Sequence, residues 1–231
     1  MTEKQKLLLI DGNSITFRGF YALFMQTERF VNHDGLHTSA VFSFKRMLDK
    51  ILDDVNPDKI LVAFDAGKKT FRTEKYSDYK AGRKNTPEEL SEQFPYVKKL
   101  LDCYGIKHYE LKNYEADDII GTMSKEAEKH GYEITIVTGD RDLTQLVTNQ
   151  TTVALTVKGV TEIEYYTPNH LSEKLGISPS QITDLKGLAG DASDNYPGVS
   201  KVGEKTALKL LNQYGTIENL YEHIDEFKNQ R

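Results

Sequence analysis

Two residue types that often mark a protein's class are nearly missing from this sequence. It has one cysteine, Cys103, and no tryptophan among 231 residues. A single cysteine excludes an internal disulfide and a cysteine-based zinc site, and we expect Cys103 to be a buried thiol in a reducing cytoplasm. No Walker-type glycine loop ending in Lys-Ser or Lys-Thr is present, which argues against nucleotide hydrolysis by that route.

Long apolar runs are also missing. Only four consecutive apolar residues, Leu7 to Ile10, precede Asp11, and this is too short for the hydrophobic region of a signal peptide. No run approaches the length that crosses a bilayer. We therefore expect a cytoplasmic protein without a membrane partner. The six histidines show no metal-ligand spacing.

Positive charge is not in excess. The chain has 30 basic and 35 acidic residues, for a net charge of −5, which taken alone argues against a nucleic-acid partner. Nine of the acids, however, are clustered at the positions described below, and without these nine, 26 acidic residues face 30 basic ones. The distribution of charge is therefore a better guide to partners than its sum.

The sequence does contain short β-rich runs that alternate with longer amphipathic stretches, which is typical of α/β proteins. Strands are predicted at 6–10, 59–64, 106–110, 133–137 and 151–157. Helices are predicted at Ser39–Leu52 and at Asp117–His130, the second ended by Gly131. After Thr167-Pro168 the chain changes to short helices. We expect an α/β domain at 1–168, with a mostly parallel central sheet flanked by helices, and a small helical domain at 169–231.

Carboxylates follow three of the apolar runs and also occur in two further segments of the chain. They are Asp11, Asp65, Glu115, Asp117, Asp118, Asp140, Asp142, Asp191 and Asp194. Because the carboxyl ends of parallel strands converge on one crevice, acids from these five segments should meet there. Each acid alone could be a turn residue or a helix cap. Gathered together, they would repel one another unless cations neutralised them.

Local spacing supports a shared site. Asp140 and Asp142 are two residues apart and would point to the same side of an extended chain. Glu115 and Asp118 are three apart, which makes them neighbours on one helix face. Oxygen-only ligation favours Mg²⁺ or Mn²⁺. Two such ions can polarise a phosphodiester, activate a water and stabilise the leaving oxygen.

A basic segment, residues 66–84, follows Asp65 directly. It holds Lys68, Lys69, Arg72, Lys75, Lys80, Arg83 and Lys84, interleaved with Phe71, Tyr76 and Tyr79. Basic groups track a phosphate backbone while aromatic faces stack bases, which is typical of a single-strand-binding channel. A solvated surface loop is the alternative. The position directly after a candidate metal ligand favours nucleic-acid binding.

Two glycines, Gly198 and Gly203, frame a predicted hairpin between short helical stretches. Glycine permits a tight turn, and backbone N–H groups there can bind a DNA phosphate without reading sequence. An ordinary turn between two helices is the alternative. The nearness of Asp194 in the chain favours the DNA-binding interpretation.

Together these motifs resemble the 5′ nuclease (flap endonuclease) family, and they are most similar to the 5′→3′ exonuclease domain of bacterial DNA polymerase I. The matching stretches run in the expected order and are Leu9–Ser14, Phe64–Ala66, Phe71-Arg72, Tyr79–Arg83, Glu115–Asp118, Thr138–Leu143, Gly190–Asn195 and Pro197–Ala207. The resemblance implies a PIN-like, resolvase-like α/β domain followed by a helix–hairpin–helix. Its arch would span about 66–90.

The resemblance also implies roles for the acids. Asp11, Asp65, Glu115 and Asp117 look like a first metal site, and Asp140, Asp142 and Asp191 look like a second, with Asp117 near both. Asp118 and Asp194 look like supporting acids. The implied cofactors are two Mg²⁺ ions, for which Mn²⁺ can substitute, and a K⁺ ion held by backbone carbonyls of the hairpin.

The implied DNA contacts come from three regions. Lys80 and Arg83 would contact the scissile phosphate from the base of the arch, and Phe17 would stack on a terminal base. The remaining contacts are Arg18, Arg72, Tyr76 and Tyr79, with Gly198, Val199, Lys201, Val202, Gly203, Lys205 and Thr206 of the hairpin gripping duplex DNA.

The expected activity is structure-selective 5′→3′ exonuclease and flap endonuclease hydrolysis of branched or nicked DNA and of RNA primers in RNA–DNA hybrids, as in replication and repair. We expect a monomer that is either a stand-alone nuclease or part of a longer DNA polymerase I chain. The family domain usually continues for several helices past the position of Arg231, so a reduced duplex-binding face is expected.

Three alternatives belong to other classes. A catalytically silent DNA-binding scaffold would gain from losing acids near phosphate. A nuclease specific for single-stranded RNA would not need the hairpin. A Mg²⁺-dependent phosphatase of small molecules would not need the basic segment.

Overall fold

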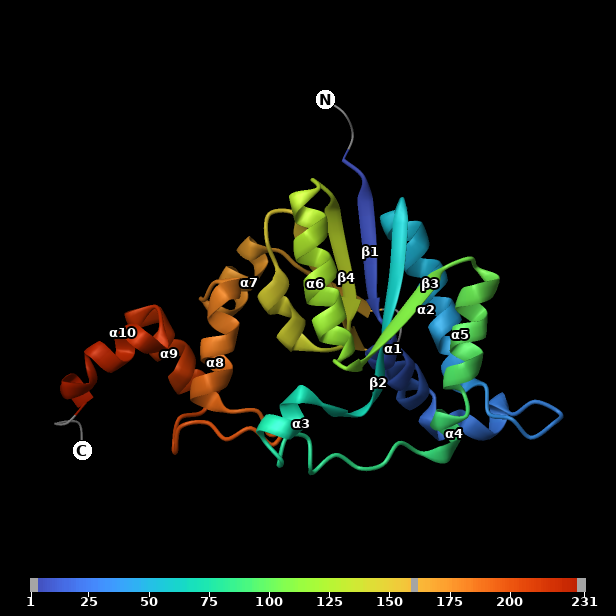
Figure 1. Ribbon diagram of the computed structural model, residues 1–231, viewed down its shortest axis with the longest axis horizontal. Helices are drawn as coiled ribbons and strands as arrows, with labels where there is room; N and C mark the ends of the chain where they lie inside the picture. The colour runs from blue at the N-terminus through green and yellow to red at the C-terminus, as the bar shows by residue number, and fades with distance from the viewer. Residues whose placement is uncertain (1–3, 159–161, 228–231) are drawn as a thin grey trace.

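The computed structural model describes residues 4–158 and 162–227, and a six-stranded sheet forms its centre (Figure 1). The strands are β1 (Lys6–Asp11), β2 (Lys59–Thr70), β3 (Lys107–Asn113), β4 (Glu133–Thr138), β5 (Thr151–Lys158) and β6 (Glu162–Tyr166), in the order β3-β2-β1-β4-β5-β6. The first five are parallel, and β6 pairs antiparallel with β5. The predicted mostly parallel sheet is confirmed. The prediction missed β6, a short, mostly half-exposed edge strand with little apolar signal.

The central strand β1 is buried on both faces. Leu7 and Leu9 belong to one hydrophobic core, and Leu8 and Ile10 belong to the other. A parallel strand covered on both sides needs a continuous apolar run rather than an alternating one. This explains why Leu7 to Ile10 is apolar throughout.

Helices cover the two faces of the sheet (Figure 1). On one face lie α1 (Gly12–Ala22), α2 (Ser39–Val55) and α5 (Phe94–Cys103), which bury Ile15, Phe44 and Leu101. On the other lie α6 (Ala116–Lys129) and the 3-10 turn η2 (Arg141–Leu146), which bury Ile120 and Leu143. Both predicted helices are present: α2 starts at the predicted residue and ends three residues later than predicted, and α6 is shifted by one residue at each end.

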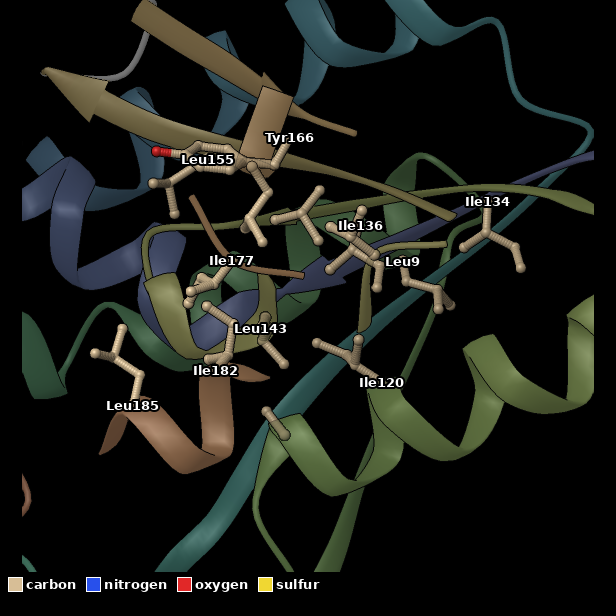
Figure 2. Packing of buried hydrophobic residues seen from close by; sticks show 14 of the residues in the cluster. Leu9, Ile120, Ile134, Ile136, Leu143, Leu155, Tyr166, Ile177, Ile182 and Leu185 are labelled. Carbon is tan, nitrogen blue, oxygen red and sulfur yellow. The ribbon is translucent and has the colours of Figure 1, made fainter. Parts of the chain in front are cut away.

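The C-terminal part is helical, as predicted. It contains α7 (Pro168–Leu175), α8 (Ile182–Ala189), α9 (Glu204–Tyr214) and α10 (Ile217–Glu222), with 3-10 turns η3 (Pro179–Gln181) and η4 (Ile224–Phe227). Figure 2 shows Ile177, Ile182 and Leu185 of this part in the same cluster as Leu143 and Ile136. The boundary at 168/169 stays a prediction, and residues 228–231 of the predicted helical domain lie outside the described residues.

The basic segment begins within strand β2 and then extends away from the sheet. Strand β2 continues past Asp65 to Thr70 and is followed by α3 (Phe71–Lys75). The chain then runs along the lower edge of Figure 1 to α4 (Glu88–Ser91), which precedes α5. Earlier in the chain, the 3-10 helix η1 (Phe24–Phe30) links α1 to the loop before α2.

Two further observations concern the expectations from composition. The expected buried thiol is wrong: Cys103 is exposed, because it is the last residue of α5 and faces outward there. Within the described part of the chain, no helix combines the length and the apolar character needed to cross a membrane.

In the loop between α8 and α9, the backbone at Gly190 lies in close contact with the backbone at Gly198. Gly190 has φ +76°, a conformation that favours glycine. A Cβ atom on Gly198 would overlap the backbone of Ala189 and Gly190, because the chain returns against the end of α8 and Val199 donates its N–H to Leu188 O at 2.8 Å. Gly198 therefore has a packing role in the fold of this loop.

Replacing Gly198 by alanine should destabilise the fold by about 1–3 kcal/mol, because backbone atoms rather than a flexible side chain must move to accommodate the methyl group. The free energy of unfolding from urea titration measures this loss. Gly82→Ala is the control, since nothing lies within 4 Å of a Cβ at that exposed position. Equal stability of the two variants would contradict the close approach.

Candidate active site

A cleft of about 600 Å³ opens at the carboxyl edge of the sheet. Seven of the nine predicted acids line it: Glu115, Asp117, Asp118, Asp140, Asp142, Asp191 and Asp194. Asp11 and Asp65 are not part of its lining, but their carboxylates are close enough to Asp117 to raise the pKa of that residue. The structure therefore brings together acids from all five predicted segments.

The topology explains this convergence. Strand β1 lies between β2 and β4, so the order of the strands reverses beside it, and such a switch point is where parallel sheets bind ligands. Asp11 ends β1, opposite Ala63, and Asp65 follows two residues later on β2. Asp140 comes three residues after Val137, the β4 partner of Ile10.

Several of the acids also begin helices. The Asp11 carboxylate accepts the Ser14 N–H at 2.9 Å and caps α1, and Asp140 accepts the Asp142 N–H at 2.9 Å and caps η2. Glu115, rather than Asp117 or Asp118, is the N-cap of α6, with Asp118 closing the capping box. The cap alternative is therefore correct for Asp140 and wrong for Asp117 and Asp118, and capping is compatible with a shared site.

The expected geometry of Asp140 and Asp142 needs a correction. The two residues were expected to share one side of an extended chain, but Asp142 lies in the first turn of η2. The cap formed by Asp140 bends the chain into this turn directly after β4. Both carboxylates line the cleft nevertheless.

Burial and mutual repulsion dominate the centre of the cluster. Burial, with added repulsion from Asp65 and Asp140, raises the pKa of Asp11 to about 7, although Ser14 and Thr138 donate hydrogen bonds to its carboxylate. Burial followed by repulsion from Asp11 and Asp140 raises the pKa of Asp117 well above its ordinary value. Burial likewise raises the pKa of Asp65.

These three carboxylates lack a close countercharge. Among the described residues, no lysine or arginine forms an ion pair with Asp11, Asp65 or Asp117. Buried, anionic oxygen atoms without a cation are the donor set that a hard divalent cation requires. As the side chains lie, however, no three acidic, histidine or cysteine groups of the described chain stand close enough together to enclose one ion.

Protein cations pair with five of the other acids of the cleft, whereas Asp140 forms no ion pair among the described residues. Lys80 Nζ lies 2.9 Å from Glu115 Oε2, and Arg83 pairs with Asp194 at 2.5 Å. Arg72 binds both oxygens of Asp118, at 2.7 and 2.8 Å. Burial alone would raise the pKa of Asp118, but the Arg72 guanidinium and the Glu115 N–H hold it below its ordinary value.

The basic segment is docked onto the loop before the hairpin. The Lys80 N–H donates to Asp194 O at 2.9 Å, the Tyr76 hydroxyl donates to Asn195 O at 3.1 Å, and Asn195 Nδ2 donates to Asp78 O at 2.9 Å. The Tyr79 hydroxyl also donates to Glu115 at 3.1 Å. These bonds hold the predicted residues Tyr76, Tyr79 and Lys80 at the edge of the cleft.

Other predicted DNA contacts lie outside the cleft lining. Phe17 packs against Tyr21 and Phe94, with ring centroids 6.5 and 6.0 Å apart, and Arg18 donates to Val157 O at 3.0 Å. The predicted hairpin contacts are also separate from the cleft, and they are Gly198, Val199, Lys201, Val202, Gly203, Lys205 and Thr206. Their role as DNA contacts stays a prediction.

Sequence reasoning missed Lys186. It lies on α8, lines the cleft, and its ammonium group contacts both Asp142 and Asp191. Its spacing of five residues before Asp191 offers no distinctive signal, because a lysine at that spacing is common on helix surfaces. Lys125 of α6 and Tyr196 also line the cleft without having been predicted.

Comparison with known proteins gives two family matches that adjoin each other. Residues 6–176 match the model of the 5′-3′ exonuclease N-terminal resolvase-like domain, and residues 177–231 match that of the 5′-3′ exonuclease C-terminal SAM fold. DNA polymerase I of Streptococcus pneumoniae is 57% identical over 229 residues, which are 99% of this chain and 26% of the relative. The chain thus spans about a quarter of the length of the curated relatives it matches.

Solved structures with low sequence identity share the fold. T5 5′-exonuclease with bound zinc has a TM-score of 0.75 at 22% identity, covering 95% of this chain and 79% of that one. The bacteriophage T5 D15 flap endonuclease in a pseudo-enzyme-product complex with DNA and metal ions has a TM-score of 0.73 at 21% identity, covering 94% and 78%. Because the family models match residues 6–176 and 177–231, the chain belongs to the 5′-3′ exonuclease family.

Proposed function

We propose that this chain is a divalent-metal-dependent, structure-selective 5′ nuclease. It hydrolyses phosphodiester bonds of DNA at 5′ flaps and nicks, and of RNA primers hybridised to DNA, as replication and repair require. The carrying observation is that acids from three segments line one cleft, with Asp11 and Asp65 of two further segments close to Asp117, and that Tyr79 and Lys80 of the basic segment also line it. The zinc and DNA complexes of the T5 enzymes support the proposal.

The acids divide into two ligand sets. Asp11, Asp65, Glu115 and Asp117 would hold one divalent ion, and Asp140, Asp142 and Asp191 would hold the other. These acids would hold Mg²⁺, or Mn²⁺ in its place, whose chemistry there would be to activate water and to stabilise the leaving oxygen. The chain itself fixes the ligands: Asp11 accepts hydrogen bonds from Ser14 N and Thr138 Oγ1, and Asp65 accepts one from Ala116 N at 2.8 Å.

Lys80 and Arg83 would stabilise the charge that develops on the reacting phosphate. Lys80 has φ 57° and is held through its backbone by Asp194, so its ammonium group projects to Glu115 within the acid cluster. A phosphate bound beside Glu115 would lie within reach of this ammonium. Arg83, which is held by Asp194, is the more exposed of the two, with about half of its side chain accessible.

The loop before α9 would hold duplex DNA. Lys201 and Lys205 are exposed there, and the first turn of a helix leaves backbone N–H groups without intrahelical partners, which suits a phosphate. A K⁺ ion held by backbone carbonyls of this hairpin would strengthen the grip. Phosphate contacts of this kind position a duplex without reading its sequence.

The proposed setting is the cytoplasm, with the chain as a monomeric nuclease. The length of the relatives named DNA polymerase I, of which the match covers 26%, supports a place within a longer chain of that kind. The products would be a 5′-phosphate and a 3′-hydroxyl.

A double-flap DNA with a labelled 5′ end should be cut near the junction in the presence of Mg²⁺. The short labelled product should disappear without Mg²⁺ and fall by at least about 100-fold in Asp140→Ala, which removes a ligand and the cap of η2. Gel analysis of the labelled strand measures both. Binding of the flap without cleavage under Mg²⁺ and Mn²⁺ would overturn the proposal in favour of a DNA-binding scaffold.

Lys80→Ala should lower kcat on the flap substrate by about 10²–10³-fold, because a preorganised cation at the phosphate is lost. Lys125→Ala is the matched control, since Lys125 also lines the cleft but makes no ion pair among the described residues. Single-turnover kinetics separate this loss from weaker binding. Turnover of a small phosphomonoester at the same rate before and after Lys80→Ala would instead favour a phosphatase.

The metal-free chain should lose stability as the pH rises from about 4 to about 7. Folding raises the pKa of Asp11 from 3.8 to about 7, mainly through burial. The folded chain therefore binds the Asp11 proton more tightly than the unfolded chain does, and the stability that this proton contributes is lost once the carboxyl ionises. In EDTA, Asp11→Asn should therefore be more stable than the wild type at pH 8 by at least about 1 kcal/mol, and not at pH 4.

Thermal unfolding of both proteins in EDTA at the two pH values measures this difference. Asp53→Asn is the control, because Asp53 is exposed on α2 and should show no pH-dependent difference. An Asp11→Asn difference of the same size at pH 4 and pH 8 would count against a protonated Asp11 in the metal-free chain.

A further inference from the structure

The Lys186 side chain joins two acids from different parts of the fold. Its Nζ lies 2.7 Å from Asp142 Oδ1 and 2.5 Å from Asp191 Oδ2. Asp142 belongs to η2, which follows β4, whereas Asp191 follows α8 in the helical C-terminal part. One ammonium group thus bridges two carboxylates that the chain supplies from segments 49 residues apart.

No other cation shares this position. Within the described ranges, Lys186 is the only lysine or arginine in ion-pair contact with Asp142 or Asp191. The second oxygen of Asp191 accepts from Ser193 N at 2.8 Å and Ser193 Oγ at 2.6 Å, so this carboxylate is held from both sides. Asp11 and Asp117, by contrast, have no such cation partner.

We propose that Lys186 is the resident counter-ion of the second metal position, a positioning residue whose ammonium group holds Asp142 and Asp191 together until a divalent ion displaces it. The inference rests on the two-metal function proposed above. An ammonium group and a divalent ion compete for the same carboxylate oxygens, so the ion can use both acids only if the ammonium withdraws. The flexible four-carbon stem of lysine permits this movement.

The arrangement has two consequences. Without metal, the ammonium group offsets the repulsion between the two carboxylates, and the helical C-terminal part remains tied to η2. When metal binds, displacing the ammonium group costs free energy. This cost weakens the binding of the ion at the second position and leaves the first position unaffected. The second ion should therefore bind more weakly than the first, and Lys186 should be the reason.

Lys186→Met tests the inference, because methionine keeps an unbranched apolar stem and removes the charge. Mn²⁺ binding to the 231-residue chain, followed by electron paramagnetic resonance and by calorimetry, should show the second ion binding about tenfold more tightly than in the wild type, with the first unchanged. Lys186→Arg should retain the weak second site. Lys125→Met removes a charge from the same cleft without an ion pair and should change neither affinity.

Stability gives an independent readout. In EDTA, Lys186→Met should unfold at a lower temperature than the wild type, because Asp142 and Asp191 then repel each other. Saturating Mn²⁺ should raise its unfolding temperature by more than it raises that of the wild type. A lysine with a purely structural role would instead lower the unfolding temperature equally with and without Mn²⁺, and that result would overturn the inference.

The outcomes separate the inference from the proposed function. If the wild type binds two ions and cuts the flap, but Lys186→Met binds the second ion no more tightly, only the inference fails. A wild type with one site and a Lys186→Met variant with two would support it, because the lysine then masks the second site. If both proteins bind a single ion, the two-metal function and the inference fail together.

Discussion

Repulsion among carboxylates gathered at one edge of a parallel sheet is the constraint on which the rest of this site depends. Asp11, Asp65 and Asp117 are held in a low-dielectric environment by the strands and by the start of α6, and burial alone disfavours their charge. A fold that pays this cost must either protonate the acids or bring cations to them. Both solutions are present. The pKa values of Asp11, Asp65 and Asp117 are raised at the centre of the cluster, and lysine and arginine side chains form ion pairs with the acids around it, which we call the rim.

The rim cations come from two places that the sequence separates widely. Arg72, Lys80 and Arg83 belong to the segment between β2 and α4, and Lys186 belongs to α8. The segment and the helical part contact each other through the Asn195 side chain and the Asp194 backbone, so hydrogen bonds link the two parts of the chain that supply the positive charge. Hydrophobic packing supports them, since Ile182 and Leu185 of α8 join the core beneath η2.

Much of this arrangement could be predicted from the sequence because its signals are local or periodic. The run Leu7 to Ile10 predicts a buried strand, and the acid that follows it marks the strand's end. The half-exposed strand β6 and the outward orientation of Cys103 could not be predicted, since they depend on which neighbours cover a residue. Lys186 was not predicted for a related reason. Its role depends on Asp142 and Asp191, which only the tertiary structure places next to it.

Two of the acids, Asp11 and Asp140, have a structural role as helix caps and also contribute charge to the cluster. These two roles limit which substitutions the site can accept. Asp11 and Asp140 each cap a helical turn and each belong to the acid cluster, Asp140 in the lining of the cleft and Asp11 buried beside Asp117. Asparagine at either position would keep the cap and lose the negative charge, and alanine would lose both. One side chain therefore serves the start of a helical turn and the charge of the cluster, so the residue at which the turn begins is constrained by the chemistry of the cleft.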